Sequence, residues 1–354
     1  MGQSNFPKSI VTNAVRMGLR NIRNDSSRGV RYMVDLGAHL AKSPEPKRFF
    51  TVIQNIFGNP KSVYYKLVSD IVRSTDAQTL ETVGINVGYM SWACGARTIR
   101  RIESSHGHSI PWTLLLDWNG KPKNHADLNS IVSQGRLLGI HTYMVFSGKD
   151  TGNTLELLDC FDSFPDCAFL LFSDSEAVTA ECAGKPLKNV MILVSYDQPK
   201  RDETMKQLAE QQRMFGAYYV YNNDNVEEIL SGRLLTQFRD LGYTMAFFVA
   251  DSQCSLLTAQ SVSQYIESNR NAQSYPIFLC ELLSDIDYVD QVVSGRSCAV
   301  QIGCNGTIRT ADGVLYDVNM RTHTLEQAFA LAFPRIAPGD RQLHSANRLH
   351  LSGY

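Results

Sequence analysis

Residues 110–147 constrain the fold more than any other part of the chain. An apolar run at 112–117 is followed by a stretch with helical spacing of its apolar residues, and then by a second apolar run at 143–146. Asp127 has the position of a helix N-cap, and Gly139 has that of a C-cap. Two apolar strands joined by one amphipathic helix form a βαβ unit, which predicts a parallel sheet covered by helices.

The same alternation continues along the chain. Further strands are predicted at 167–172, 189–195, 217–221, 245–250 and 276–280, and helices at 154–161, 175–182, 201–214, 226–241 and 259–271. Seven strands in one direction predict an α/β fold built as a partial or complete (β/α) barrel of the TIM type. A doubly wound sheet is the alternative, but no glycine-rich dinucleotide loop follows the first strand.

Composition narrows the class of protein. The chain has 354 residues, 44% of them apolar, and a net charge of −1, which gives no global case for a nucleic-acid partner. We expect no membrane-spanning run and no signal peptide. The eight cysteines are scattered without paired CxxC motifs. This pattern predicts reduced, buried thiols in a cytoplasmic protein.

The N-terminal region is basic and helical. Residues 1–48 hold nine Lys or Arg against three acidic residues. A helix at 10–22 would place apolar side chains on one side and arginines on the other, so it could contact an anionic membrane surface or a partner. The favoured alternative is an ordinary helix packing on its own domain. Helices are also predicted at 47–56 and 61–73, whereas glycines leave 84–103 unassigned.

In a (β/α) barrel, ligands bind at the C-terminal ends of the strands, here called the barrel mouth. Polar side chains at these predicted ends form a candidate ligand-binding set for a cation or an amine: Asp117, Ser147, Asp174, Asp197, Asn222, Asn225, Asp251 and Glu281. For any single residue, capping of the following helix is the favoured alternative. We find no HExxH, GxSxG, P-loop or histidine cluster, so no catalytic residue and no metal ligand is assigned.

Several stretches resemble the radical S-adenosylmethionine superfamily, on the branch that includes the hopanoid-biosynthesis adenosyltransferase. The matching stretches are IPW (110–112), SQGRLLGI (133–140), LLDCFDSFPDCAFLLFS (157–173), FGAYYVYNNDNVEEILS (215–231), YPIFL (275–279), SC (297–298) and ADG (311–313). The resemblance covers residues 110–331. It implies a basic N-terminal region over 1–108, a radical-SAM-like barrel with a C-terminal hairpin over 109–333, and a tail over 334–354.

The chain departs from that pattern where the family binds its cofactors. The family's CxxxCxxC loop corresponds to WNGKPKNH at 118–125, which contains no cysteine. Its Gly-Gly-Glu-Pro segment corresponds to SGKDT at 147–151, where Lys149 would face a ligand ammonium. Its TNG strand end has become SDS at 173–175, and its Pro-Cys has become YD at 316–317. We therefore expect neither a [4Fe–4S] cluster nor S-adenosylmethionine.

A different set of thiols is the alternative for a metal. Cys298 and Cys304 could reach one ion together with Cys280 or Cys254. Nothing in their spacing requires such a site, and ordinary buried thiols are the favoured interpretation.

Two functional hypotheses follow. The first is a non-catalytic, radical-SAM-like pseudoenzyme that acts as partner, scaffold or substrate-presenting subunit for an active radical enzyme, a paralogue or a second copy. The alternative is a repurposed enzyme or small-ligand binder that uses Asp117, Asp197, Asp251 and Glu281 at the barrel mouth. A peripheral membrane contact through the basic helix is a further hypothesis.

Overall fold

Ten strands form one sheet in the structure, a computed structural model that describes residues 7–40, 44–119 and 126–334. The order across the sheet is β10-β9-β8-β1-β2-β3-β4-β5-β6-β7. Strands β1 to β7 pair in parallel with their sequence neighbours, which confirms the predicted α/β architecture. They are β1 (Thr113–Asp117), β2 (Thr142–Gly148), β3 (Ala168–Ser173), β4 (Val190–Ser195), β5 (Phe215–Tyr221), β6 (Met245–Ala250) and β7 (Phe278–Glu281).

The sheet does not close, so it forms a partial barrel. β8 (Val300–Gly303) pairs in parallel with β1 on the side away from β2. A hairpin of β9 (Thr307–Thr310) and β10 (Gly313–Asn319) continues the sheet in antiparallel order. Within the described residues, β7 and β10 are therefore the two edges of the sheet.

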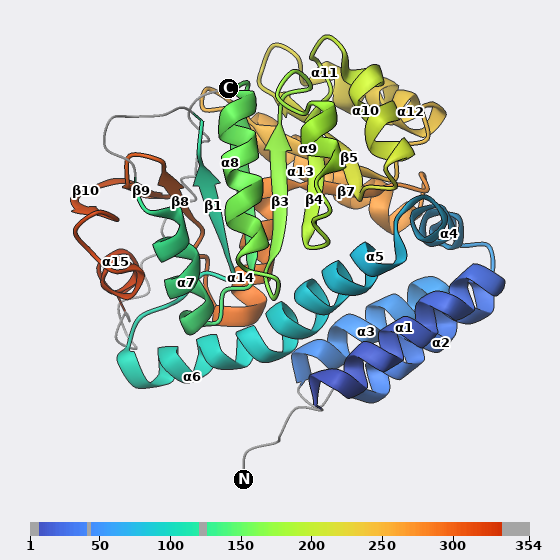
Figure 1. Ribbon diagram of the computed structural model, residues 1–354, viewed down its shortest axis with the longest axis horizontal. Helices are drawn as coiled ribbons and strands as arrows, with labels where there is room; N and C mark the ends of the chain where they lie inside the picture. The colour runs from blue at the N-terminus through green and yellow to red at the C-terminus, as the bar shows by residue number, and fades with distance from the viewer. Residues whose placement is uncertain (1–6, 41–43, 120–125, 335–354) are drawn as a thin grey trace.

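Helices cover both faces of the sheet. α7 and α8 lie in front of it in Figure 1, whereas α14 lies behind it. The helices that follow β1 are α7 (Leu128–Leu138), α8 (Thr151–Asp162), α9 (Ala180–Gly184), α10 (Arg201–Glu210), α11 (Glu227–Leu230), α12 (Arg233–Asp240), α13 (Leu256–Ala272), α14 (Leu282–Ser294) and α15 (Leu325–Ala332). Every residue of β2, β3, β4 and β6 is buried, as strands covered on both faces must be.

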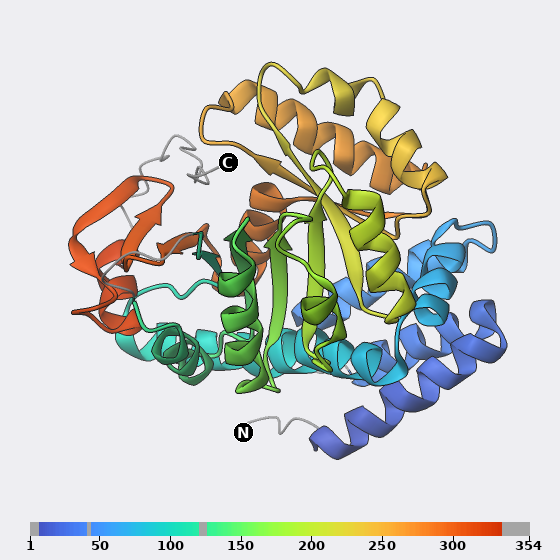
Figure 2. The same cartoon turned by 45° about the horizontal axis from the view of Figure 1, so that its top comes forward.

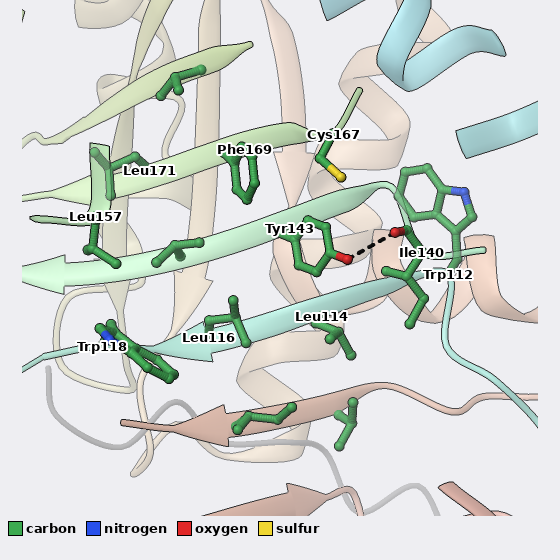
Figure 3. Close-up of a cluster of buried hydrophobic side chains, with 14 of the residues drawn as sticks. Trp112, Leu114, Leu116, Trp118, Ile140, Tyr143, Leu157, Cys167, Phe169 and Leu171 are labelled. Atoms are coloured by element: carbon green, nitrogen blue, oxygen red, sulfur yellow. Dashed lines mark hydrogen bonds between the residues drawn. The ribbon is translucent and has the colours of Figure 1, made fainter. Parts of the chain in front are cut away.

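The outer core lies between the sheet and the helices α7 and α8. Figure 3 shows Leu114, Leu116 and Tyr143 pointing into this layer from β1 and β2. The buried Tyr143 hydroxyl donates to the carbonyl oxygen of Ile140 at 2.9 Å, so its polar atom is satisfied within the apolar layer. Phe169 of β3 adds a ring to the same layer.

The opposite face carries a second set of side chains, here called the inner core. Its centre is Phe172, whose ring stacks on Phe146 at 4.4 Å and meets Tyr218 and Phe247 edge to face at 5.5 and 5.7 Å. The buried members come from the seven strands β1 to β7 and from α14: Leu115, Met144, Phe146, Leu170, Phe172, Met191, Leu193, Tyr218, Met245, Phe247, Val249, Cys280, Leu282, Leu283 and Ile286. The barrel interior is therefore packed with the chain's own apolar side chains.

The predicted caps of the first crossover helix are confirmed. The Asp127 carboxylate accepts from the backbone N–H of Ser130 at 3.1 Å at the start of α7. Gly139 ends the helix in the left-handed conformation, with φ of 98°. These two residues fix where the chain turns out of β1 and back into β2.

Two other helix predictions are wrong in extent. The helix expected over 226–241 is divided into α11 and α12 by Gly232, which takes a left-handed φ of 76°. The helix expected over 175–182 is reduced to α9, which Thr179 caps. It starts late because Ser175 is engaged elsewhere: its hydroxyl donates to the Pro199 carbonyl, and its carbonyl accepts from the Thr204 hydroxyl.

The N-terminal region is entirely helical where it is described. Its elements are α1 (Lys8–Asn24), α2 (Ser26–Leu40), α3 (Pro44–Gly58), α4 (Tyr64–Ser74), α5 (Ala77–Gly84), the π-helix η1 (Ile85–Gly95) and α6 (Ala96–His106). The run from α5 to α6 crosses the end of the sheet at which the parallel strands begin (Figure 1 and Figure 2). The stretch 84–103, left unassigned because of its glycines, is thus continuous helix. No described helix is both long and apolar enough to cross a bilayer.

Close backbone contact joins this region to the sheet. A Cβ at Gly95 of η1 would meet the carbonyl oxygen of Gly139 at 2.2 Å. Earlier in η1, the Asn86 amide donates to the Cys167 carbonyl oxygen at 2.7 Å, and the hydroxyls of Ser91 and Thr142 lie 2.7 Å apart. The glycines that obscured the helix in the sequence allow this approach.

We expect Gly139→Ala to destabilise the chain more than Gly107→Ala. Both glycines have a left-handed φ, 98° and 74°, which costs an alanine about 1 kcal/mol. Gly107 has open space around its Cα, whereas a methyl group on Gly139 would meet the Gly95 carbonyl oxygen at 2.7 Å. The additional loss in free energy of unfolding should be about 1–3 kcal/mol by urea titration. Equal losses would contradict the close contact.

Candidate functional site

The carboxyl ends of the parallel strands share one end of the sheet, the upper end in Figure 1. The eight residues of the predicted mouth lie in or just after these strand ends, from Asp117 in β1 to Glu281 in β7. The structure divides them among separate hydrogen-bond networks. Their role in ligand binding stays a prediction, and their surroundings decide what chemistry each can offer.

Ser147 is fully buried and faces away from the inner core. Its hydroxyl donates to the Ser173 hydroxyl at 2.9 Å and accepts from the Thr154 hydroxyl of α8 at 3.2 Å. Beside it, the Asn153 amide donates to the carbonyl oxygens of Trp118 and Ser147 at 2.6 and 3.0 Å. Asn153 was missed in the sequence, and it fixes the ends of β1 and β2 relative to each other.

Asp174 is buried above the inner core at the end of β3. Its carboxylate accepts from the Tyr218 hydroxyl at 3.5 Å. Burial raises the pKa of Asp174, and the nearby charge of Lys149 partly offsets that increase. Lys149, which we expected to repel a ligand ammonium, thus stabilises a neighbouring carboxylate.

Asn222, Asn225 and Asp251 form one network. The Asn222 amide donates to the Asp251 carboxylate at 3.0 Å, and the Asn225 side chain accepts from the Asn222 backbone N–H at 2.8 Å. The Asn225 amide in turn donates to the Val220 carbonyl oxygen at 3.0 Å. These bonds shape the turns after β5 and β6.

Glu281 is only 1% exposed and caps α14. One carboxylate oxygen accepts from the Tyr221 hydroxyl at 2.8 Å, and the other accepts from the Ser284 backbone N–H at 2.8 Å. Glu281 is therefore a helix N-cap, which is the alternative that we favoured for any single residue of the mouth.

Asp117 and Asp197 lie on opposite sides of the mouth. The Asp117 carboxylate accepts from the Gln301 amide at 3.4 Å, and burial raises its pKa while Arg309 opposes the increase. Asp197 is exposed in an open hollow that residues 196–203 line. There the Arg201 guanidinium lies over the Tyr196 ring at 4.1 Å.

The acidic residues do not gather at one point. Within 7–40, 44–119 and 126–334, no three His, Cys, Asp or Glu side chains lie where they could hold a metal ion together. The hypothesis of a repurposed acidic centre therefore has to use single carboxylates. Asp117, Asp174 and Asp197 are the candidates, because burial raises the pKa of each.

The cysteines are dispersed and mostly buried. Cys298 and Cys280, which we considered as metal ligands, are 1% and 7% exposed, and burial raises the pKa of both thiols well above the ordinary value. Burial also raises the pKa of Cys160 to about 12. Because cluster ligands are thiolates and no described trio gathers, the described residues do not fit a cluster held by three thiolates. Residues 120–125 of the loop after β1 lie outside the described residues.

No protein-family model matches the chain. No curated protein matches its sequence. Among solved structures, the fold is similar to Streptococcus suis SuiB bound to S-adenosylmethionine, with 13% identity and a TM-score of 0.48 over 66% of this chain and 66% of that chain. The chain thus spans just under two thirds of SuiB in that match.

A second SuiB structure matches with 12% identity and a TM-score of 0.42, over 84% of this chain and 75% of that one. Native anSMEcpe with bound AdoMet matches with 10% identity and a TM-score of 0.41, over 61% and 80%. These neighbours are radical S-adenosylmethionine enzymes. At such low identity the similarity concerns the fold alone.

The expectation that the chain takes neither a [4Fe–4S] cluster nor S-adenosylmethionine is contradicted by these comparisons. The solved neighbours include SuiB and anSMEcpe with S-adenosylmethionine bound. Those ligands belong to the neighbours, and they contradict an absence predicted from the departures at 118–125, 147–151, 173–175 and 316–317. The prediction is withdrawn.

We expect Glu281→Ala to lower the free energy of unfolding by about 2 kcal/mol or more, because the change removes both the α14 cap and the acceptor of the Tyr221 hydroxyl. Glu281→Gln keeps one acceptor oxygen, which can accept from the Ser284 N–H, and its NH2 group can donate to the Tyr221 hydroxyl oxygen, so it should lose less. Urea titration of the two variants measures the difference. Equal losses would show that these bonds do not stabilise the fold.

Proposed function

We propose that the chain is a non-catalytic partner subunit with a radical-SAM-like fold, which scaffolds an active radical enzyme or presents its substrate. The observation that supports this role is that local partners occupy the side chains at the barrel mouth. Phe146, Phe172, Tyr218 and Phe247 fill the inner face of the sheet, and α14 adds Leu282, Leu283 and Ile286 over them. Active (β/α) barrels have a packed interior too, so the mouth is where a reactant would have to bind.

The surroundings of the mouth residues support the same role. Most of these side chains are satisfied by the nearest backbone or side-chain groups, as Glu281 and Asn225 illustrate. A general acid or base would instead face an open pocket with its proton available. We propose that the partner is a paralogous active enzyme or a second copy of the chain. The division into 1–108, 109–333 and 334–354 and a cytoplasmic setting belong to this proposal.

Reconstitution tests the partner role. We would isolate the complex from native cells, identify the partner by mass spectrometry, and assay the recombinant partner with and without stoichiometric chain. We expect several-fold higher turnover with the chain present. Equal turnover without it, or turnover by the chain alone, would contradict the proposal.

A small-ligand site at the mouth is the second candidate, favoured by the buried Asp174 beside Lys149. A ligand that carries both charges would be drawn to this pair. Loss of ligand-dependent thermal stabilisation in Asp174→Asn, with stabilisation kept in Asp251→Asn, would support this candidate over the partner role.

A peripheral membrane contact is a separate proposal about α1. Most of its apolar face packs on its own region, as the bundle interpretation predicts, and Arg16 pairs with Glu81 at 2.7 Å. Two apolar side chains nevertheless stay on the surface: Ile10 is 49% and Met17 is 54% exposed. They lie seven positions apart, on one helix face, and the exposed Arg20, three positions after Met17, is next to them on that face.

Vesicle co-sedimentation tests this contact. We expect the chain to sediment with phosphatidylserine vesicles at low salt and to be released at high salt, because screening weakens attraction to anionic lipid. Ile10→Ser with Met17→Ser should reduce binding several-fold. Leu257→Ser, at a residue 76% exposed on α13, is the matched control. Binding unaffected by salt and by the α1 changes would refute the contact.

A further inference from the structure

Asp290 is a carboxyl group that none of the proposed roles uses. It lies in the last turns of α14 and is 0% exposed. One of its oxygens accepts from the Trp112 backbone N–H at 2.8 Å, immediately before β1. A buried carboxyl is costly to ionise, so its protonation state is tied to how closely these two segments approach.

A second, half-buried carboxyl on α6 holds the same segment. Glu103 of α6 accepts from the Ile110 backbone N–H at 2.8 Å. The Ser294 hydroxyl of α14 donates to the Ile110 carbonyl oxygen at 2.9 Å, and the Arg100 guanidinium of α6 donates to the Val293 carbonyl oxygen at 3.0 Å. Residues 110–112 are thus clamped between α6 and α14. We call these contacts the α14 joint.

Burial and the charge of Asp287 on α14 disfavour an ionised Asp290 and raise its pKa. The backbone N–H groups of Trp112 and Cys298 and the Cys298 thiol, just before β8, favour the ionised form and partly offset that increase. The cations Arg100 and Arg296 act instead on Glu103. Burial is the largest effect, and the pKa of Asp290 is raised from 3.8 to about 7.

The joint controls a helix that covers the inner core. At its N-terminal end α14 contributes Leu282, Leu283 and Ile286 to that core, and Asp285 pairs with Arg270 of α13 at 2.8 Å. The N-terminal end is therefore anchored to α13, while the C-terminal end depends on the joint. We propose that the α14 joint is a pH-sensitive latch: protonated Asp290 keeps α14 docked against the start of β1, and ionisation of Asp290 opens it.

Proton linkage decides whether a rise in pH opens or closes the joint. A released carboxyl has its ordinary pKa of 3.8, whereas the docked one has a pKa of about 7. The docked state therefore retains a proton that the open state has lost, so the opening constant rises with pH through this interval and levels off above it. Between pH 6 and pH 8 these values give an increase of about tenfold.

Hydrogen exchange measured by mass spectrometry tests the latch in the full chain. After correction for intrinsic exchange, the protection factors of residues 282–294 should fall about tenfold between pH 6 and pH 8, while those of β3 and β4 stay constant. Asp290→Asn keeps the acceptor for the Trp112 N–H without the charge. It should abolish the pH dependence and leave α14 protected at both values.

Asp287→Asn is the matched control on the same helix, because Asp287 is partly exposed and bonds Gln291. It should keep the pH dependence with its midpoint at a lower pH, because the charge of Asp287 contributes to the raised pKa of Asp290. Constant protection of α14 in the unmodified chain, an equal change in β3 and β4, or loss of the dependence in Asp287→Asn would each overturn the latch. If Asp290→Asn does not fold, the pH profile of the unmodified chain decides.

Discussion

Burial of both faces of the parallel sheet is the constraint on which the rest of the structure depends. Strands such as β3 are apolar at almost every position, so each face needs an apolar cover. α7 and α8 cover the outer face. On the inner face, aromatic side chains of the strands pack against one another and against α14. The inner face is therefore core, and polar groups are confined to its rim. This arrangement gives the mouth residues local hydrogen-bond partners, such as Tyr221 for Glu281.

Much of this arrangement was accessible from the sequence. The unit at 110–147 was identified with its caps Asp127 and Gly139, because strand and helix periods and cap residues agree there. Among the mouth residues, the position of Ser147 could have been foreseen. It alternates with Phe146, an inner residue, so the pleat turns its side chain to the outer face. The mouth side chains bond to groups on neighbouring strands. A single sequence does not show which strands are neighbours, so these hydrogen bonds could not be predicted from it.

The parts that the sequence misplaced have tertiary causes. Gly95 looked like a helix breaker, yet it lies within a helical run. A glycine is needed there because the Gly139 carbonyl oxygen approaches it too closely for a Cβ. Gly232 was placed inside a helix that it divides. The cofactor prediction relied on four short stretches, at 118–125, 147–151, 173–175 and 316–317, and solved structures of similar fold with S-adenosylmethionine bound contradict it.

The helix α14 connects the two ends of the barrel. Glu281 holds its first turn to Tyr221 at the mouth, and Asp290 holds its last turns to Trp112 where the sheet begins. A helix of 13 residues moves largely as one body, because its backbone bonds resist bending. A ligand or partner that displaces α14 at the mouth would therefore strain the joint beneath, and ionisation of Asp290 would favour the same displacement. Such coupling requires only that α14 has two positions, docked and open. It does not need a continuous path of side chains between the two sites.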